Sequence, residues 1–273
     1  ARGRVSHRAA SPRVVLRVPE PYRKLLAPGY AAALVALALG MVFLLADVGR
    51  ADRVLLLLAN PTLSFVAVGA WSLAACAVLA ALAALAWGGF ACRASLRAVR
   101  VLEVALAVVA LVVMAYTGLL LADSAIPLWS TWTLVALFFF SALSTGVSTV
   151  LLIDYFTQGQ TLLLRSVKPL QKAHVACLVL EAIALALFLL SAFSNPQAQQ
   201  SVALLLEPDM LANGVVGVLG MGLAVPLVLE TASLLRKESR SIPVSDVVCL
   251  IGGLVLRYCV VMCGAHWAGP VFF

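Results

Sequence analysis

Apolar residues gather in seven long runs along the chain, separated by short polar stretches. The runs cover roughly 30–46, 64–87, 102–122, 132–153, 172–193, 211–234 and 244–263. A helix that crosses the hydrocarbon of a membrane takes about 17–25 residues, so each run is long enough to span. The runs are apolar on every face, whereas strands of a membrane barrel alternate apolar and polar residues over about ten positions. The pattern therefore predicts an all-α, polytopic transmembrane helical bundle with seven spans in this chain.

The polar stretches between the runs differ in charge. Basic residues concentrate in four of them: seven before the first run and three in each loop after the second, fourth and sixth runs. Cytoplasmic loops carry an excess of Lys and Arg, so these four stretches are expected on the inner side. The outer loops hold only Arg50 and Arg53, beside acidic residues. With 63% hydrophobic and 11% charged residues, the net charge of +7 reflects this topology and contact with anionic lipid, and it argues against a nucleic-acid partner.

The chain begins with a basic segment, ARGRVSHRAASPRVV, that has neither an initiator Met nor the apolar core of a signal peptide. We expect a basic cytoplasmic tail or loop over 1–27 and the transmembrane bundle over 28–273. The absent Met favours a fragment of a longer protein in which an earlier helix leads into this loop. A native basic tail is the alternative.

The stretch 116–146 has the pattern of a transmembrane hairpin: the end of one run, a polar turn and an aromatic-rich run that returns. Asp123 lies in the turn, where hydrocarbon gives way to water, and Tyr116 lies on the same helical face two turns deeper. A polar head group could be held between these two side chains. The structural alternative makes Tyr116 an interfacial aromatic and Asp123, like Asp47, a helix-end residue that pairs with a nearby arginine.

Five ionisable side chains fall inside the apolar runs or at their inner ends, where each costs several kcal/mol unless it is paired or hydrated. They are Asp154, Glu181, Glu230, Asp246 and Arg257. One interpretation is structural pairing across helices. The other is a proton route through Glu181, Arg257 and Asp154, and the sequence leaves both open. Three serines on one face of the run 132–153 are typical of a small-residue packing seam.

The pattern of cysteines and histidines does not favour a metal cofactor. The six cysteines show no C-x2-C-x2-C run, and all but Cys92 lie within the apolar runs, as packing thiols do. A haem with two histidine ligands needs both at similar depth, but His174 and His266 fall at opposite ends of the membrane. We therefore expect no iron–sulfur cluster, haem or other metal site in this chain.

Five segments, taken in order, carry a resemblance to a known family. They are DVGRADR at 47–53, NPTLSFVAVGAW at 60–71, YTGLLLADS with PLW at 116–129, SALSTG at 141–146 and LRYCVVMCGAH at 256–266. Together they resemble the polysulfide reductase NrfD family over nearly everything after the basic tail. A proline commonly follows the arginine of the first segment in that family, whereas Ala51 stands there in this chain.

The resemblance implies a quinol-interacting membrane subunit of a respiratory complex in a bacterial or archaeal cytoplasmic membrane. It also implies eight or more spans, so a first helix that contributes to the quinone pocket is expected to be missing from the seven runs. An iron–sulfur, ferredoxin-like subunit would dock on the outer face, with expected contacts from Arg50, Arg53, Asn60 and Trp129. A catalytic oxidoreductase subunit would complete the enzyme, because this chain is not expected to be catalytic alone.

The same resemblance implies a bound quinone or menaquinone, and we expect its site near the outer surface, between the first three runs. Quinol oxidation releases two protons with two electrons, so the site needs a hydrogen-bond donor for a ring oxygen and a carboxylate that passes protons to water. Tyr116 is the expected donor, and Asp123 or Asp47 is the expected proton acceptor. Two other classes of function stay open: a structural anchor without quinone chemistry, and a secondary transporter, although no convincing internal repeat is present.

Overall fold

The structure is a computed structural model of the whole chain, in which residues 20–48, 65–87, 96–158, 164–236 and 244–265 are described. The helices in chain order are α1 (Glu20–Val48), α3 (Phe65–Trp87), α4 (Leu96–Ala122), α5 (Trp132–Gln158), α6 (Leu164–Ser194), η2 (Pro196–Ala198), α7 (Gln199–Leu205), α8 (Pro208–Ala212), η3 (Asn213–Ala224), α9 (Val225–Arg236) and α10 (Val244–Ala265). Within these residues, seven helical stretches are long and apolar enough to cross a membrane, and no strand is present. The predicted all-α transmembrane bundle is confirmed.

Most spans extend past the apolar runs, especially at the inner end. α5 continues to Gln158 and α6 begins at Leu164, whereas the corresponding runs are 132–153 and 172–193. Hydropathy marks where the hydrocarbon ends, but a helix still satisfies its own backbone groups in the interfacial region. The helices therefore continue beyond the first charged residues.

The sixth span differs in pitch along its length. α8 leads into η3, which is a π-helix, and α9 completes the span. The N–H of Val225 donates to the carbonyl of Gly220, five residues back, as π-type turns require. The short helices η2 and α7 precede this span, and nothing in the hydrophobic pattern predicts either them or the π-helix.

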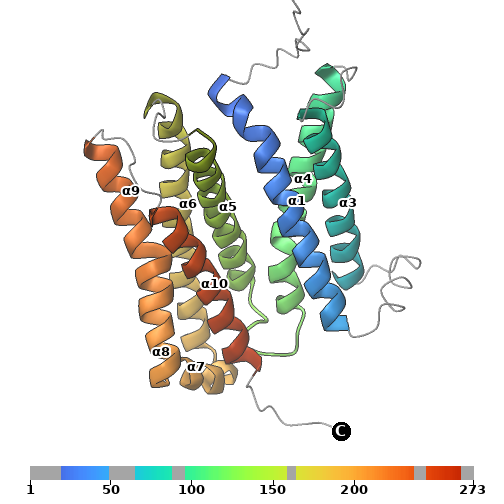
Figure 1. Cartoon of the computed structure of the whole chain (residues 1–273). Coiled ribbons are helices and arrows are strands. Elements are labelled where there is room, and N and C mark those ends of the chain that lie inside the picture. The colour runs from blue at the N-terminus through green and yellow to red at the C-terminus, as the bar shows by residue number, and fades with distance from the viewer. Residues whose placement is uncertain (1–19, 49–64, 88–95, 159–163, 237–243, 266–273) are drawn as a thin grey trace, which may run out of the picture.

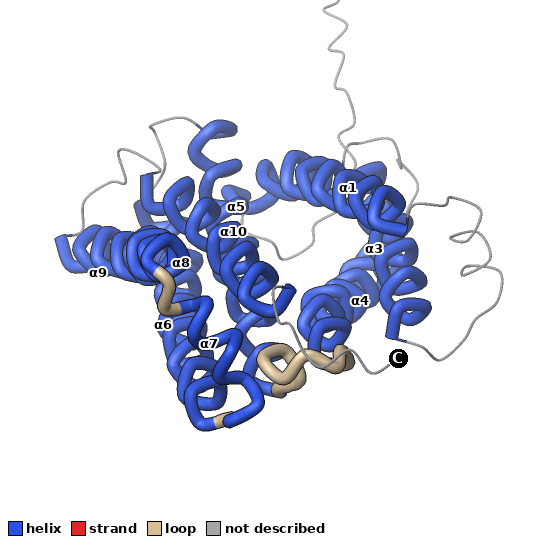
Figure 2. Tube along the Cα trace, turned by 90° about the horizontal axis from the view of Figure 1, so that it is seen from below, coloured by secondary structure: helices blue, strands red, loops and turns tan. Residues whose placement is uncertain are grey.

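The spans form two groups that stand side by side (Figures 1 and 2). One group contains α1, α3 and α4, and the other contains α5, α6, η3 with α9, and α10. Contacts of α1 and α4 with α5 join the groups. The turn between α4 and α5 lies at the same end of the bundle as α7 and α8 (Figure 1), and the distribution of basic residues predicts that this is the outer end.

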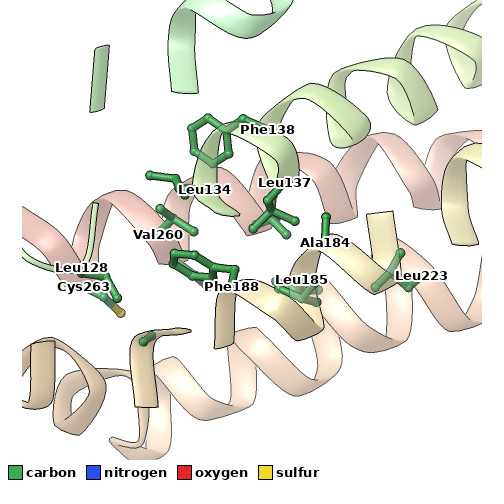
Figure 3. Close-up of a cluster of buried hydrophobic side chains, with 14 of the residues drawn as sticks. Leu128, Leu134, Leu137, Phe138, Ala184, Leu185, Phe188, Leu223, Val260 and Cys263 are labelled. Atoms are coloured by element: carbon green, nitrogen blue, oxygen red, sulfur yellow. The ribbon is translucent and has the colours of Figure 1, made fainter. Parts of the chain in front are cut away.

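Each group has its own buried core. Small side chains let α3 and α4 approach closely in the first, whose buried members are Cys76, Ala80, Ala83 and Leu106. Leucine and aromatic side chains fill the second, where Leu134, Leu137, Phe138, Phe188 and Val260 pack together (Figure 3). A close backbone approach joins α10 to η3, where Gly252 faces Gly222.

The outward faces of the spans are apolar as well. Phe43 is 71% exposed, Phe156 is 74% exposed and Leu235 is 82% exposed. Exposed apolar surface of this kind has a stable environment in lipid, where it meets hydrocarbon tails instead of water. The described spans are thus those of a multi-pass membrane protein.

Candidate functional site

The turn between α4 and α5 forms the outer edge of the candidate site. The N–H of Asp123 donates to the carbonyl of Leu119 at 3.0 Å, at the end of α4. Further along, the N–H groups of Trp129 and Ser130 both donate to the carbonyl of Ile126 at 3.0 Å. These backbone bonds give the turn a closed, defined shape.

Trp129 fastens this turn to α10. Its indole Nε1–H donates to the carbonyl of Val260 at 2.9 Å. The ring lies on Gly264, where an added Cβ would come within 2.1 Å of Trp129 Cε2. The indole is thus bound to α10, and the expected contact of Trp129 with a partner subunit stays a prediction.

Asp123 is exposed at the outer end of α4. It lines a cavity of about 170 Å³ together with Leu119, Ala122, Ser130, Thr131 and Trp132. Its carboxylate therefore has polar neighbours on the turn and direct access to the surface. A carboxylate in this place can exchange protons with water.

Tyr116 lies deeper on the same helix, about 10 Å from Asp123 along the axis. Its side chain is 9% exposed, and its ring lies against α3 at Gly69, where a Cβ would fall 1.8 Å from Tyr116 Cε2. Only a glycine leaves room for the ring at this contact. Tyr116 does not line the cavity beside Asp123, so the two side chains sit at separate depths.

The hydroxyl of Tyr116 is buried and has no hydrogen-bond partner among the residues that the structure describes. Leaving such a group unsatisfied costs about 1–3 kcal/mol, and buried polar atoms without a partner are uncommon. The hydroxyl is thus suited to bond a polar group of a ligand.

For four further residues expected at the outer face, the structure does not describe the side chains. Asp47 lies in the last turn of α1, but its side chain is outside the described part. Arg50, Arg53 and Asn60 lie outside the described residues. Their expected roles stay predictions.

Polar side chains also meet inside the second group. Ser144 of α5 donates from Oγ to Oε2 of Glu181 on α6, and both residues are buried. Asp154, further along α5, is 2% exposed. The serines of α5 therefore do more than form a small-residue seam, because at least one of them holds a carboxylate of the neighbouring helix.

Arg257 of α10 binds its own helix. Its Nη1 donates to the carbonyl of Gly253 at 2.9 Å, and its guanidinium carbon stands 5.9 Å from the ring centroid of Phe138. Ser141 Oγ and Arg257 Nη1 both lie within 4 Å of the place that a Cβ on Gly253 would take. Both Arg257 and Glu181 are described, and no direct ion pair joins them.

A further polar cluster lies toward the inner end of this group. His174 of α6 is fully buried; its Nε2 is 2.9 Å from Ser148 Oγ and 3.7 Å from Cys249 Sγ, and its Nδ1 is 3.5 Å from Glu230 Oε1. Sequence reasoning used His174 only to argue against haem. The available signal was its spacing, because His174 and Glu181 are seven residues apart and so share one face of α6.

Comparison with known proteins adds an independent line of evidence. A polysulfide reductase subunit of Wolinella succinogenes is 30% identical over 175 residues, which are 62% of this chain and 55% of that protein. The chain therefore spans about half the length of the curated relative that it matches. No solved structure matches this chain. Residues 14–268, which include all seven spans, match the family described as polysulphide reductase, NrfD, and the chain belongs to that family.

Proposed function

We propose that this chain binds quinol or quinone near the outer face of the membrane and exchanges electrons with an iron–sulfur partner subunit. Family membership supports the general class in this proposal, a membrane subunit of a respiratory oxidoreductase complex. The relative's name denotes one subunit of polysulfide reductase, and so an enzyme with several subunits. The proposed quinone binding and electron exchange rest on the residues at the outer ends of α1 and α4.

The observation that carries the proposal is the buried Tyr116 hydroxyl, which lacks a hydrogen-bond partner among the described residues. The ring oxygens of a quinone accept hydrogen bonds, so a tyrosine hydroxyl in an apolar surrounding is a fitting donor. When bound, the quinone supplies the two-electron chemistry. Tyr116 would orient the ring, and the apolar side chains of α3 and α4 around it would exclude water.

Protons need a way from the site to solvent. Asp123 is exposed and lies on the same helical face as Tyr116, nearer to the outer surface. We assign it the transfer of protons to water, with Asp47 of α1 on the opposite wall. The separation of Tyr116 and Asp123 along α4 requires the ring, a water molecule or the second carboxylate to connect them.

The electrons must leave through another protein. The sequence has no C-x2-C-x2-C run, so the clusters belong to a partner. We place this partner on the outer face of a bacterial or archaeal cytoplasmic membrane, against the α4–α5 turn and the segment with Arg50, Arg53 and Asn60. The catalytic subunit would exchange electrons with that partner.

We also propose that Glu181, Arg257 and Asp154 belong to a proton route through the second group. The support is the bond from Ser144 to Glu181 and the place of Arg257 Nη1 and Ser141 Oγ, both near Gly253, since polar groups in hydrocarbon are costly without a role. Glu181→Gln keeps the shape but removes the charge. We expect it to reduce proton movement driven by quinol oxidation in proteoliposomes; unchanged proton movement would leave structural pairing as the role of Glu181.

The quinone site is tested in the complex with its partner subunits, with Tyr116→Phe, Asp123→Asn and Asp47→Asn as variants. Loss of one hydrogen bond to the ring corresponds to about 1–1.5 kcal/mol, or roughly a tenfold weaker affinity, so we expect a clear fall in quinol oxidation. Assembly is checked by co-purification of the partner.

Two matched variants serve as controls. Tyr258→Phe changes a tyrosine that is 45% exposed on α10, and Asp209→Asn changes an acidic residue of α8 at the outer end. Both should oxidise quinol at the parental rate. If all three site variants assemble and also keep the parental rate, the proposed site is wrong and the structural-anchor function is favoured.

A further inference from the structure

The inner end of the second group brings together three potential metal ligands that the quinone site does not use. His174 comes from α6, Glu230 from α9 and Asp246 from α10, and all three residues are buried. One potential ligand atom from each lies within 4.8 Å of the other two. We propose that His174, Glu230 and Asp246 bind a divalent transition-metal ion such as Zn²⁺ or Mn²⁺.

The orientation of His174 is the first argument. Its Nε2 lies 2.9 Å from Ser148 Oγ, which leaves Nδ1 facing the carboxylates. Nδ1 has no hydrogen-bond partner among the described residues, although the side chain is fully buried. If Nε2–H donates to Ser148, Nδ1 keeps the lone pair that a metal ion requires. Metal-binding histidines commonly have such a partner on the other ring nitrogen, which fixes both tautomer and orientation.

The position of Glu230 is the second argument. Ser245 of α10 donates to Glu230 Oε1 at 2.9 Å, and the same oxygen lies 3.5 Å from His174 Nδ1. The carboxylate is thus held with one oxygen beside the imidazole. A hydrogen-bonded carboxylate next to an oriented histidine is the arrangement expected around a metal ion.

The distances fit a small cation. Zinc binds nitrogen and oxygen ligands at about 2.0–2.2 Å, so neighbouring ligand atoms of a tetrahedral site stand about 3.4 Å apart. The His174–Glu230 distance of 3.5 Å already meets this requirement. The widest separation, at most 4.8 Å, requires the side chains to approach by up to about 1.4 Å.

Ligand chemistry selects the class of ion. One imidazole and two carboxylates suit zinc, manganese or iron, whereas calcium and magnesium prefer oxygen ligands alone. Two carboxylates and a neutral imidazole carry a formal charge of −2, which a divalent ion balances. A bound ion would connect α6, α9 and α10 at their inner ends, and a water molecule can complete the coordination.

A second interpretation uses the same residues without a metal. A protonated His174 between two carboxylates would hold the three helices by charge alone. The two interpretations differ in metal content, so the proposal can be tested directly. The test does not depend on quinone binding.

The experiment uses the purified complex, treated with a chelator and then equilibrated with Zn²⁺ or Mn²⁺. We expect about one tightly bound ion for each copy of this chain, measured by elemental mass spectrometry. Glu230→Gln and Asp246→Asn keep the side-chain shapes and should each weaken binding at least tenfold, as loss of a charged ligand does. Glu181→Gln removes a buried carboxylate outside the cluster and should keep the parental metal content.

Measurement on the parental complex decides the matter even if the ligand variants do not assemble. X-ray absorption at the zinc edge should show nitrogen and oxygen ligands with the signature of one imidazole. A parental complex that retains neither Zn²⁺ nor Mn²⁺ would overturn the proposal. Metal content that stays at the parental level in the Glu230→Gln, Asp246→Asn double variant would do the same.

Discussion

Replacing Gly252 with alanine should destabilise the second helix group. Gly252 of α10 faces the backbone of η3, and a Cβ there would lie 2.1 Å from Gly222 Cα and 2.3 Å from Gly222 N. Backbone atoms cannot turn aside as flexible side chains do. The two helices would therefore have to separate along their whole contact, or one of them would have to bend.

The size of the effect follows from the distances. Ordinary contact begins near 3.4 Å, so the helices lack about 1.3 Å of room for the new methyl group. Overpacking of this kind costs typically about 1–3 kcal/mol, against a gain of about 0.5–1 kcal/mol from replacing glycine in a helix. Because the opposing atoms are backbone, we expect a net loss of about 2 kcal/mol, or a fall of about 4–8 °C in apparent Tm.

Thermal unfolding in detergent, followed by intrinsic fluorescence, measures this effect. Gly222→Ala is the matched control, because its Cβ would stand 3.4 Å from the Gly252 backbone and so makes ordinary contact. Gly146→Ala is a second control, because nothing lies within 4 Å of its Cβ. We expect the lowest apparent Tm for Gly252→Ala. An apparent Tm for Gly252→Ala equal to or above that of Gly222→Ala would refute the close approach of α10 and η3.

Three further outcomes are expected. Gly69→Ala should lower quinol oxidation, because its Cβ would fall 1.8 Å from the Tyr116 ring and displace it; a parental rate with intact assembly would contradict the placement of the ring. Trp129→Phe should lower apparent Tm by about 2–4 °C, because it removes the 2.9 Å hydrogen bond to α10, worth about 1 kcal/mol. With Asp123→Cys as the single cysteine, an impermeant thiol reagent should label the protein only from the outer side. With Arg100→Cys as the single cysteine, it should do so only from the inner side; the reverse pattern would show that the predicted topology is wrong.

The positions of the spans could be predicted because a membrane imposes them. Hydrocarbon thickness sets a length of apolar sequence, and seven such runs correspond to the seven spans of the structure. The α4–α5 hairpin with Tyr116 and Asp123 followed from the same pattern, together with their spacing of seven residues. The predicted helix ends were less accurate, because an apolar run stops before the hydrogen bonding of its helix does.

The rotation of each helix about its axis could not be predicted. In a soluble protein a polar face marks the outside, but lipid is as apolar as a protein core. In α3, for example, Ala67 is fully buried while Val66 and Val68 are more than 40% exposed, and no difference in polarity separates them. Side-chain size gives a weak signal instead, because small residues allow close helix contact.

Contacts between distant segments were missed for the same reason. His174, Glu230 and Asp246 come from three helices, and their meeting depends on how all three are rotated. For Trp129 the resemblance implied only a contact with a partner subunit, and nothing in the sequence predicted its bond to α10. Its place on Gly264 depends on where α10 ends, which lies far along the sequence.

The π-helix η3 gives one span a length that can change without changing its orientation. Each residue of an α-helix turns the backbone by about 100°, so deleting one residue from a regular span rotates everything beyond it. A π-type segment holds surplus residues relative to an α-helix, and a deletion there can be absorbed by a local return to α-type bonding. Glu230 in α9 would then keep its direction toward α6 and α10. Insertions and deletions within the membrane part of this fold are therefore expected to collect in Asn213–Ala224, while α9 and α10 keep their lengths.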